Sequence, residues 1–250
     1  MPRDISCSIC AGPCDLLDVV DFNKSCLENN GHQLPLAGRP VYYARCNQCG
    51  FCFAPELHAW DRDRYRREIY NADYAIVDPE YIDVRPRANA HMLHGAFGAH
   101  AAGIRHLDYG GGNGLLSQEL RRAGWSSASY DPMENDAKPA VGATYDLITA
   151  FEVFEHVPDP HAMMHTLTRH LSEQGMVFFT TETCDAEAVP GRRLTWWYAA
   201  PRNGHVSLYS RTSLSTLGQQ HNLKLHSFAP AYHAYYRAVP SWARHLFGAV

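Results

Sequence analysis

Four glycines and an aspartate lie close together between positions 108 and 114, in a stretch suited to bind a ligand. Before it, Ile104–Tyr109 has the apolar character of a buried strand, and after it Leu115–Ala123 continues with helical spacing. The glycines permit positive φ values and close approach of a ligand to the backbone. The turn therefore predicts backbone N–H groups and a helix N-terminus presented to a nucleotide-like cofactor.

Two carboxylates flank this turn. Asp108 ends the first strand, and Asp131 follows Ala128–Tyr130 after a spacing that fits a turn, a helix and a strand. A carboxylate at the end of the second strand can accept hydrogen bonds from both ribose hydroxyls. The pattern Asp-x-Gly-x-Gly-x-Gly resembles motif I of class I S-adenosylmethionine (SAM) methyltransferases. SAM carries a cationic amino group and a sulfonium but no pyrophosphate, so a carboxylate at the turn suits it better than a phosphate-binding nest does.

The resemblance implies that the turn, the loop after the second strand and the end of the next strand bind the cofactor. The expected residues are Asp108, Tyr109, Gly110, Gly112, Asn113, Gly114, Asp131, Pro132, Met133, Phe151 and Glu152. Met133 and Phe151 are expected to sandwich the adenine. Because no full α/β unit fits between residues 132 and 144, the usual third strand is expected to be reduced or absent, and no residue is assigned to the adenine amino group.

The cysteines concentrate near the N-terminus, where seven of the eight precede residue 53. Four of them form two pairs, Cys7-x-x-Cys10 and Cys46-x-x-Cys49. The two-residue spacer lets both thiolates of a pair reach one tetrahedral ion, so two pairs predict a closed structural Zn²⁺ site. Disulfides or an iron–sulfur cluster are the alternatives, and Cys14 and Cys52 are alternative ligands. We expect a zinc ribbon, because so short a segment cannot hold a core without metal.

Strands and helices alternate after residue 103, as in Tyr145–Phe151, a helix to about residue 171, and Gly175–Thr181. This order predicts an α/β fold with a doubly wound, Rossmann-like class I methyltransferase sheet, closed by antiparallel strands in 222–228 and 231–238. We expect three segments: a zinc-ribbon-like domain (1–55), a helical cap or linker (56–102) and a SAM-dependent methyltransferase domain (103–250). The tyrosines of the middle segment either wall a substrate pocket or pack the ribbon against the main domain.

Composition and charge narrow the class of protein. With 46% hydrophobic residues, 250 residues can bury one sizeable core. A net charge of −4 argues against a nucleic-acid partner, and the basic run at 62–67 is interleaved with acids as on a solvated helix face. No apolar run is long enough for a membrane helix, and the N-terminus does not resemble a signal peptide. We expect a cytoplasmic enzyme with a small-molecule substrate; the pattern does not indicate an oligomeric state.

Methyl transfer to a hydroxyl requires alignment of the acceptor and removal of its proton. His156 follows the Tyr145–Phe151 strand, and His205 lies in an aromatic loop that begins at Trp196. We expect either histidine to act as the general base, with Trp197 among the pocket-lining residues. The predicted catalytic set is His156, His205, Glu155 and Tyr198. The alternatives are a helix cap for His156 and core packing for the aromatic residues.

A metal offers another interpretation of the same residues. The group Glu152, Glu155, His156 and His205 resembles the metal site of small-RNA 2′-O-methyltransferases and the Glu-x-x-Glu-His of ubiquinone-pathway enzymes. Neutral imidazoles with carboxylates form a credible ligand set, and a divalent ion would lower the pKa of an acceptor hydroxyl.

Three motifs between residues 104 and 228 resemble the class I group that includes ubiquinone-pathway O-methyltransferases: LDYGGGNG, YDP and FEVFEHVPDP. The double cysteine pair followed by a tyrosine-rich segment looks like the zinc-bearing sugar methyltransferases. Together they imply SAM-dependent methyl transfer to a hydroxyl of a small polar acceptor, a sugar or nucleotide-sugar. The alternatives are a sugar C-methyltransferase, a metal-assisted O-methyltransferase and a non-catalytic SAM-fold binding subunit.

Overall fold

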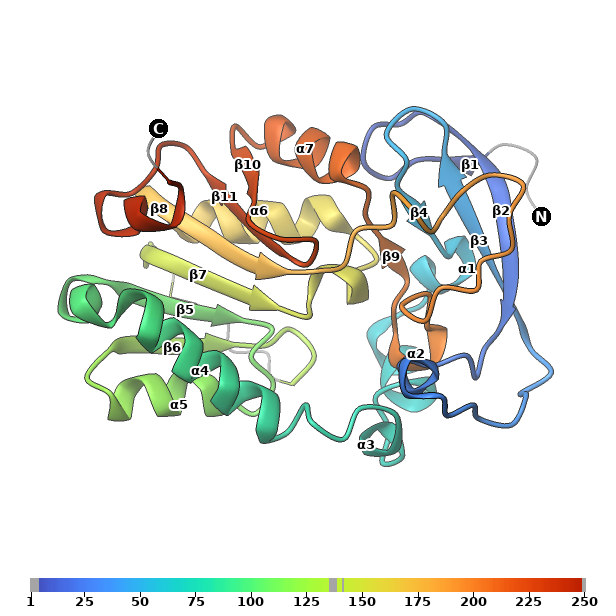
Figure 1. The fold of residues 1–250 in the computed structure, drawn as a ribbon, viewed down its shortest axis with the longest axis horizontal. Helices are drawn as coiled ribbons and strands as arrows, with labels where there is room; N and C mark the ends of the chain where they lie inside the picture. The colour runs from blue at the N-terminus through green and yellow to red at the C-terminus, as the bar shows by residue number, and fades with distance from the viewer. Residues whose placement is uncertain (1–4, 135–138, 141, 249–250) are drawn as a thin grey trace. The chain divides into compact units, whose positions relative to one another are not determined.

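The computed structural model describes residues 5–134, 139–140 and 142–248, and it divides the chain into two compact units (Figure 1). Unit 1 combines the N-terminal residues to Pro79 with Phe154–Met163 and Thr181–Gln220, and unit 2 comprises the remainder. This division differs from the expected boundaries at residues 55 and 102. Phe154–Met163 and Thr181–Gln220 were expected in the methyltransferase domain. They belong to unit 1 because the strand and the helices that they contain pack with the N-terminal residues.

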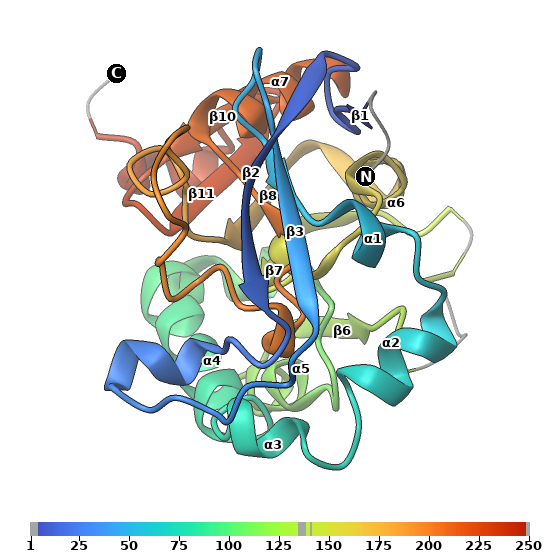
Figure 2. The ribbon, with the colours of Figure 1, turned by 90° about the vertical axis from the view of Figure 1, so that its right-hand side faces the viewer.

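Unit 1 is built on a five-stranded antiparallel sheet in the order β1-β2-β3-β4-β9. The strands are β1 (Ile5–Ser6), β2 (Pro13–Asp21), β3 (Pro40–Cys46), β4 (Cys52–Phe53) and β9 (Ser207–Leu208). Figure 2 shows β2 and β3 as a long pair that lies side by side. β3 pairs with both β2 and β4, and β9 pairs with β4 although about 150 residues separate them in the chain.

Short helices complete unit 1. They are η1 (Cys26–Asn30), α1 (Pro55–His58), α2 (Arg62–Glu68), α3 (Tyr74–Val77), η3 (Phe154–His156), η4 (Pro201–Asn203) and α7 (Arg211–Gln220). Asp61 caps α2 by accepting a hydrogen bond from the Arg64 N–H at 2.7 Å. At α7, the Ser210 and Ser213 hydroxyls each accept the other residue's N–H at 2.9 Å. Side chains therefore cap the N-termini of both α2 and α7.

Unit 2 contains a six-stranded sheet in the order β10-β11-β8-β7-β5-β6. The strands are β5 (Arg105–Tyr109), β6 (Ser126–Tyr130), β7 (Tyr145–Phe151), β8 (Leu171–Thr180), β10 (Lys224–Ser227) and β11 (Tyr232–Tyr236). The β6, β5, β7 and β8 strands are parallel, and β11 and β10 close the sheet antiparallel, as expected. Within the described residues β6 forms the edge of the sheet. Residues 135–138 and 141, in the stretch where the third strand is expected to be reduced or absent, lie outside the description.

Helices flank this sheet and bury its faces. They are α4 (Val84–Phe97), η2 (Gly98–Gly103), α5 (Leu115–Arg122), α6 (Pro160–His170, whose first turn is counted with unit 1) and η5 (Ser241–Leu246). Figure 1 shows α4 alongside α5. Leu116 and Leu120, one turn apart on α5, are buried with Leu93 and Phe97 of α4 in one apolar core. No helix in the described part of the chain is long and apolar enough to span a membrane.

The direction of chain progression reverses beside β5. The chain passes from β5 through α5 to β6 on one side, and then returns past β5 to β7 and β8. In doubly wound sheets, ligands bind outside the carboxyl ends of the strands at the point where the strand order reverses. The observed order confirms the predicted Rossmann-like class and places this switch point at the carboxyl ends of β5 and β7.

Candidate functional site

The glycine turn follows β5 at the switch point of the sheet. Gly110, Gly112 and Gly114 have φ values of +75°, +52° and +74°, a region that favours glycine. A Cβ at Gly110 would lie 2.4 Å from Val153, and one at Gly111 would lie 2.4 Å from an Asp108 oxygen. At Gly112 a Cβ would meet nothing within 4 Å. The turn is therefore tightly packed at its base and open at Gly112, where a ligand can approach the backbone.

Asp131 lies directly after β6 and ties this turn to the neighbouring strand. Its Oδ2 accepts a hydrogen bond from the Gly112 N–H at 2.8 Å, and its Oδ1 accepts one from the Met133 N–H at 2.7 Å. The residue is partly exposed. Each carboxylate oxygen can accept more than one hydrogen bond. The side chain can thus hold the turn and still accept the two hydroxyls of a ribose.

Asp108 lies beneath the turn in a buried polar network. Its Oδ1 accepts from the Thr149 hydroxyl at 2.8 Å, and Thr149 in turn accepts from His106 Nε2 at 2.9 Å. His106 Nδ1 then accepts from the Ser127 hydroxyl at 2.8 Å. Burial raises the pKa of Asp108 to about 7 and lowers the pKa of His106 to about 3. Asp108 therefore supports the turn from below.

Glu152, at the end of β7, has a strained backbone with a φ of +53°. Its N–H donates to the Thr180 hydroxyl at 2.9 Å, and that hydroxyl donates to Glu152 Oε1 at 2.9 Å. Phe151 packs edge-on against Phe178 with ring centroids 5.7 Å apart. Non-glycine residues at positive φ cluster at functional sites. Both half-buried side chains lie at the carboxyl end of β7, where the resemblance predicted cofactor contacts.

The other predicted cofactor residues also gather around the turn. Tyr109 is buried against Tyr130 with ring centroids 5.8 Å apart. Asn113 donates from Nδ2 to the Ile82 carbonyl at 2.9 Å and accepts at Oδ1 from the Leu115 N–H at 3.1 Å. The polar atoms of the Asn113 side chain are thus hydrogen-bonded to the protein's own backbone. Pro132 and Met133 form the turn after Asp131. Direct contact of these residues with a cofactor stays a prediction.

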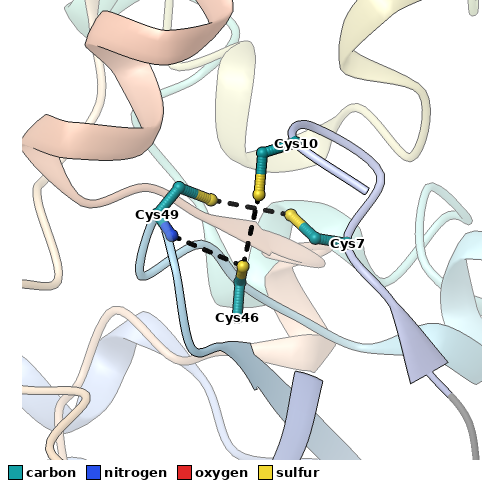
Figure 3. A group of neighbouring side chains, drawn as sticks. All are labelled: Cys7, Cys10, Cys46 and Cys49. Carbon is teal, nitrogen blue, oxygen red and sulfur yellow. Dashed lines mark hydrogen bonds between the residues drawn. The ribbon is translucent and has the colours of Figure 1, made fainter. Parts of the chain in front are cut away.

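Four cysteine thiols converge in unit 1, as Figure 3 shows. The Sγ atoms of Cys7 and Cys49 lie 3.6 Å apart, and those of Cys10 and Cys46 lie 3.4 Å apart. All four Sγ atoms lie within 4.8 Å of one another. A tetrahedral ion with bonds of about 2.3 Å to sulfur needs sulfurs about 3.8 Å apart. All four are free thiols, so the arrangement fits an ion and not a pair of disulfides.

The backbone at each cysteine pair is shaped to hold a charged sulfur. Cys7 Sγ accepts from the Ile9 N–H at 3.4 Å, and Cys46 Sγ accepts from the Gln48 and Cys49 N–H groups at 3.4 Å. Such bonds favour the thiolate form that a metal binds. Cys14 and Cys52, the alternative ligands, are buried outside this cluster, and the Cys14 thiol donates to the Gly12 carbonyl.

A second group in unit 1 joins Glu155, His156 and His205, whose ligand atoms also lie within 4.8 Å of one another. Glu155 Oε1 is 3.9 Å from His156 Nε2, and the two imidazole rings meet edge-to-face with centroids 4.9 Å apart. The Val206 N–H donates to the Glu155 carbonyl at 2.8 Å, which ties the two chain segments together. The structure therefore assembles three of the predicted residues, whereas Glu152 lies in unit 2.

Hydrogen bonds orient both imidazoles. His205 Nδ1 donates to the Tyr198 carbonyl at 2.8 Å, which leaves its Nε2 with the lone pair in the neutral ring. His156 Nδ1 lies 3.1 Å from the Tyr70 hydroxyl. His205 is almost fully buried, with 4% of the residue exposed, whereas 17% of the His156 side chain is exposed. His156 is thus the more accessible of the two predicted bases.

Aromatic residues surround His205. The Tyr198 ring packs against it with centroids 4.2 Å apart, and Tyr198 is only 1% exposed. Trp196 and Trp197 are half-buried and lie 5.1 Å and 5.2 Å from Tyr198, measured between ring centroids. Tyr198 thus forms the wall behind the histidine, while the tryptophans keep surface that a ligand could contact.

Comparison with known proteins identifies the family to which this chain belongs. Residues 81–227, more than half of the chain, match the family model described as a methyltransferase domain. The chain belongs to this methyltransferase family. The matched range begins near the start of α4 and includes the glycine turn, Asp131 and the Glu155–His156 segment.

Curated relatives of this methyltransferase share its core. The ubiquinone biosynthesis O-methyltransferase of Parvibaculum lavamentivorans is 31% identical over 39% of this chain and 48% of its own length. The protein of the same name from Klebsiella pneumoniae is 26% identical over 50% of this chain and 66% of its own. The chain thus spans about half the length of the first of these relatives. Among solved structures, mitomycin 7-O-methyltransferase superposes with a TM-score of 0.49 at 11% identity, over 70% of this chain and 60% of that one.

Several residues of the methyltransferase sites were not predicted from the sequence. His106 and Thr149 are polar residues inside otherwise apolar strands, which was the available signal for the Asp108 network. Tyr70 is one of the middle-segment tyrosines that were expected to wall a pocket or pack the ribbon, but its contact with His156, 86 positions away in the chain, was not predicted. Nothing in the local sequence indicated that pairing.

The buried Asp108 predicts an unusual pH dependence of stability. Its folded pKa of about 7 exceeds the ordinary value of 3.8, so the folded state keeps a proton that the unfolded state releases. Stability is therefore lost as pH rises from about 4 to about 7, by roughly 4 kcal/mol for a shift of about three units. Asp108→Asn should escape this loss. Hydrogen exchange of the β5 amides in SAM-free protein measures this stability. Over that pH range the free energy of unfolding of Asp108→Asn should rise relative to that of wild type. A difference independent of pH would contradict the burial of Asp108.

Proposed function

We propose that this protein transfers a methyl group from SAM to a hydroxyl of a small polar acceptor, a sugar or nucleotide-sugar. The observation that carries the SAM assignment is the position of Asp131. Its carboxylate lies at the end of β6, holds the Gly112 N–H, and remains partly exposed at the switch point of the sheet. Family membership and the open space above Gly112 support the same assignment.

When bound, SAM supplies an electrophilic methyl group. Asp131 would accept the ribose hydroxyls, and the backbone from Gly110 to Gly112 would line the cofactor. Met133 and Phe151 would enclose the adenine. The buried Asp108 keeps the turn in place, and its carboxylate becomes easier to ionise when a cation lies close to the turn.

The acceptor hydroxyl must lose its proton as its oxygen bonds to the methyl carbon. We propose that His156 or His205 accepts this proton, because a neutral imidazole takes up a proton near neutral pH. His205 has its Nδ1–H committed to the Tyr198 carbonyl, so Nε2 is the accepting atom. Glu155, buried beside His156, would stabilise the imidazolium that forms.

The sugar assignment rests on the aromatic loop. Trp196 and Trp197 are half-buried beside Tyr198, and Tyr198 packs on His205. Aromatic faces beside a proton acceptor suit a ring with apolar C–H faces and several hydroxyls. A screen of nucleotide-sugars with methyl-labelled SAM tests this proposal. Labelling of a hydroxyl oxygen supports it, labelling of carbon identifies a C-methyltransferase, and SAM binding without any transfer favours the non-catalytic alternative.

The four-cysteine cluster is proposed to hold one structural Zn²⁺. Four converging thiols with N–H groups directed at sulfur provide a closed coordination sphere, which leaves no open position for a substrate. The ion would therefore stabilise the sheet of unit 1.

The SAM assignment predicts a specific loss in Asp131 variants. Asp131→Ala should abolish SAM binding in titration calorimetry, and Asp131→Asn should weaken it by about tenfold or more, since each hydrogen bond to a charged group contributes about 1.5–3 kcal/mol. Glu134→Ala is the matched control, because this carboxylate lies on the same turn but is exposed. Equal SAM affinity in wild type and Asp131→Ala would refute the assignment.

A further inference from the structure

We infer that Ser127, His106 and Thr149 are positioning residues that couple binding of the cofactor to ionisation of Asp108. The three form one hydrogen-bond relay that crosses β6, β5 and β7 and ends at the Asp108 carboxyl group. In the register of the sheet, Ser127 lies directly beside His106, and Thr149 lies directly beside Asp108. The coupling rests on the proposed function, because the cofactor concerned is SAM.

The direction of hydrogen bonding in this relay is set by the charge on Asp108. An ionised carboxylate only accepts, so the Thr149 hydroxyl donates to Oδ1 at 2.8 Å and accepts in turn from His106 Nε2, 2.9 Å away. Burial lowers the pKa of His106 to about 3, so the ring is neutral and this bond uses its one N–H. Its Nδ1 then accepts from the Ser127 hydroxyl at 2.8 Å. Every member of the relay thus donates toward Asp108.

The two carboxyl oxygens of Asp108 have different surroundings. Oδ1 faces the relay, whereas Oδ2 lies beneath the glycine turn, where a Cβ at Gly111 would be only 2.4 Å away. Asp108, His106 and Thr149 are all buried, and Trp125 packs edge-on against the His106 ring with centroids 6.1 Å apart. Hydrogen bonds are electrostatically stronger in such surroundings than in water. The relay therefore stabilises the anion through one oxygen and leaves the other oxygen toward the turn.

Burial and hydrogen bonding oppose each other at Asp108. Burial raises its pKa to about 7, the hydrogen bond from Thr149 lowers it, and the negative charge of Asp131 raises it further. Among the described titratable residues, His106 on the same strand is neutral, and Asp131 after β6 is the group that acts on Asp108 by charge. Without cofactor, Asp108 therefore keeps its proton below about pH 7. A SAM cation beside the turn favours the anion, and the proton passes to solvent.

This coupling predicts a pH profile for SAM affinity. Above about pH 7 Asp108 is already ionised, so affinity should stay constant. Below that pH, binding must displace the proton, and affinity should fall by about tenfold per pH unit. The amino group of SAM keeps its charge in this range, because α-amino groups have a pKa of about 7.7–8.0. Calorimetry in buffers of different ionisation enthalpy should count close to one proton released per SAM bound on the acidic side.

Substitutions within the relay should move this profile. Thr149→Val keeps the side-chain shape and removes the donor, so the midpoint should rise by about one pH unit or more. His106→Leu should raise it less, and His106→Gln, whose amide can donate in place of the Nε2–H, should restore it. Thr168→Val is the matched control. The Thr168 hydroxyl donates to the Met164 carbonyl at 2.7 Å within α6, outside the relay, so its loss should leave the profile unchanged.

NMR of the SAM-free protein measures the relay by itself. The carboxyl carbon of Asp108 should titrate with a pKa of about 7 in wild type and a higher pKa in Thr149→Val. Once Asp108 is ionised, the ring nitrogens of His106 should show the proton on Nε2. Ser127→Ala, at a half-buried position on the edge strand β6, is expected to fold and should raise the pKa of Asp108 slightly.

Three results would overturn the coupling: SAM affinity in wild type that is the same on both sides of pH 7, an Asp108 pKa that Thr149→Val leaves unchanged, or the Nδ1–H form of His106 beside ionised Asp108. Its failure differs from failure of the proposed function. SAM binding with a flat pH profile refutes the coupling and leaves the proposed function standing. Absence of SAM binding at every pH refutes the proposed function and, with it, the coupling.

Discussion

Removal of the zinc proposed for the four-cysteine cluster should unfold unit 1 while unit 2 stays folded. Cys46 links β3 to the cluster, and its thiol lies 3.4 Å from that of Cys10. Structural zinc sites contribute about 10–16 kcal/mol of apparent binding free energy, which is as large as the whole stability of a typical domain of about 5–15 kcal/mol. Cys46→Ser should therefore abolish protection from hydrogen exchange in β2 and β3 and preserve it in β5 and β7.

The chain offers a matched control for this experiment. Cys14 is the direct cross-strand partner of Cys46 in the β2–β3 ladder, and it is buried but outside the cluster. Cys14→Ala should cost about 1 kcal/mol, as single substitutions commonly do, and should keep one zinc per chain by elemental analysis. If Cys14→Ala unfolds unit 1 as completely as Cys46→Ser does, packing and not metal holds the sheet. Iron in place of zinc would assign the cluster differently.

Replacement of the histidine that acts as the general base should slow methyl transfer without weakening SAM binding. His156→Ala or His205→Ala should lower turnover by about 10²- to 10⁴-fold, because a positioned general base contributes that much to the rate. A general base acts on the proton of the acceptor and not on the cofactor, so SAM affinity should not change. The measurements are single-turnover rates with the acceptor found by screening, and SAM affinity by calorimetry.

Two further variants sharpen this test. His91→Ala should retain wild-type turnover, because His91 is exposed on α4. Tyr70→Phe removes the hydroxyl that lies 3.1 Å from His156 Nδ1 and keeps the ring. It should lower turnover less than His156→Ala does and should shift the pH profile of the reaction, since the hydroxyl affects the basicity of the imidazole. Near-wild-type rates in both His156→Ala and His205→Ala would mean that alignment alone drives transfer.

The sequence was sufficient for features that are local. A strand, a glycine turn and a helix occupy consecutive residues, so the positions of Asp108 and Gly110–Gly114 followed from composition and periodicity. Asp131 could be placed because one turn, one helix and one strand separate it from Asp108. The cysteine pairs could be recognised for the same reason. The two-residue spacer is a local feature, and it lets both thiolates of a pair reach one ion.

The way in which distant segments combine could be seen only in the tertiary structure. β9 pairs with β4 across about 150 residues, which brings the aromatic loop and His205 into unit 1. Strand periodicity shows which residues share a face but not which strand will be the neighbour. The same limit hid the network from Ser127 through His106 and Thr149 to Asp108, because its members come from three strands that meet only when the parallel sheet forms.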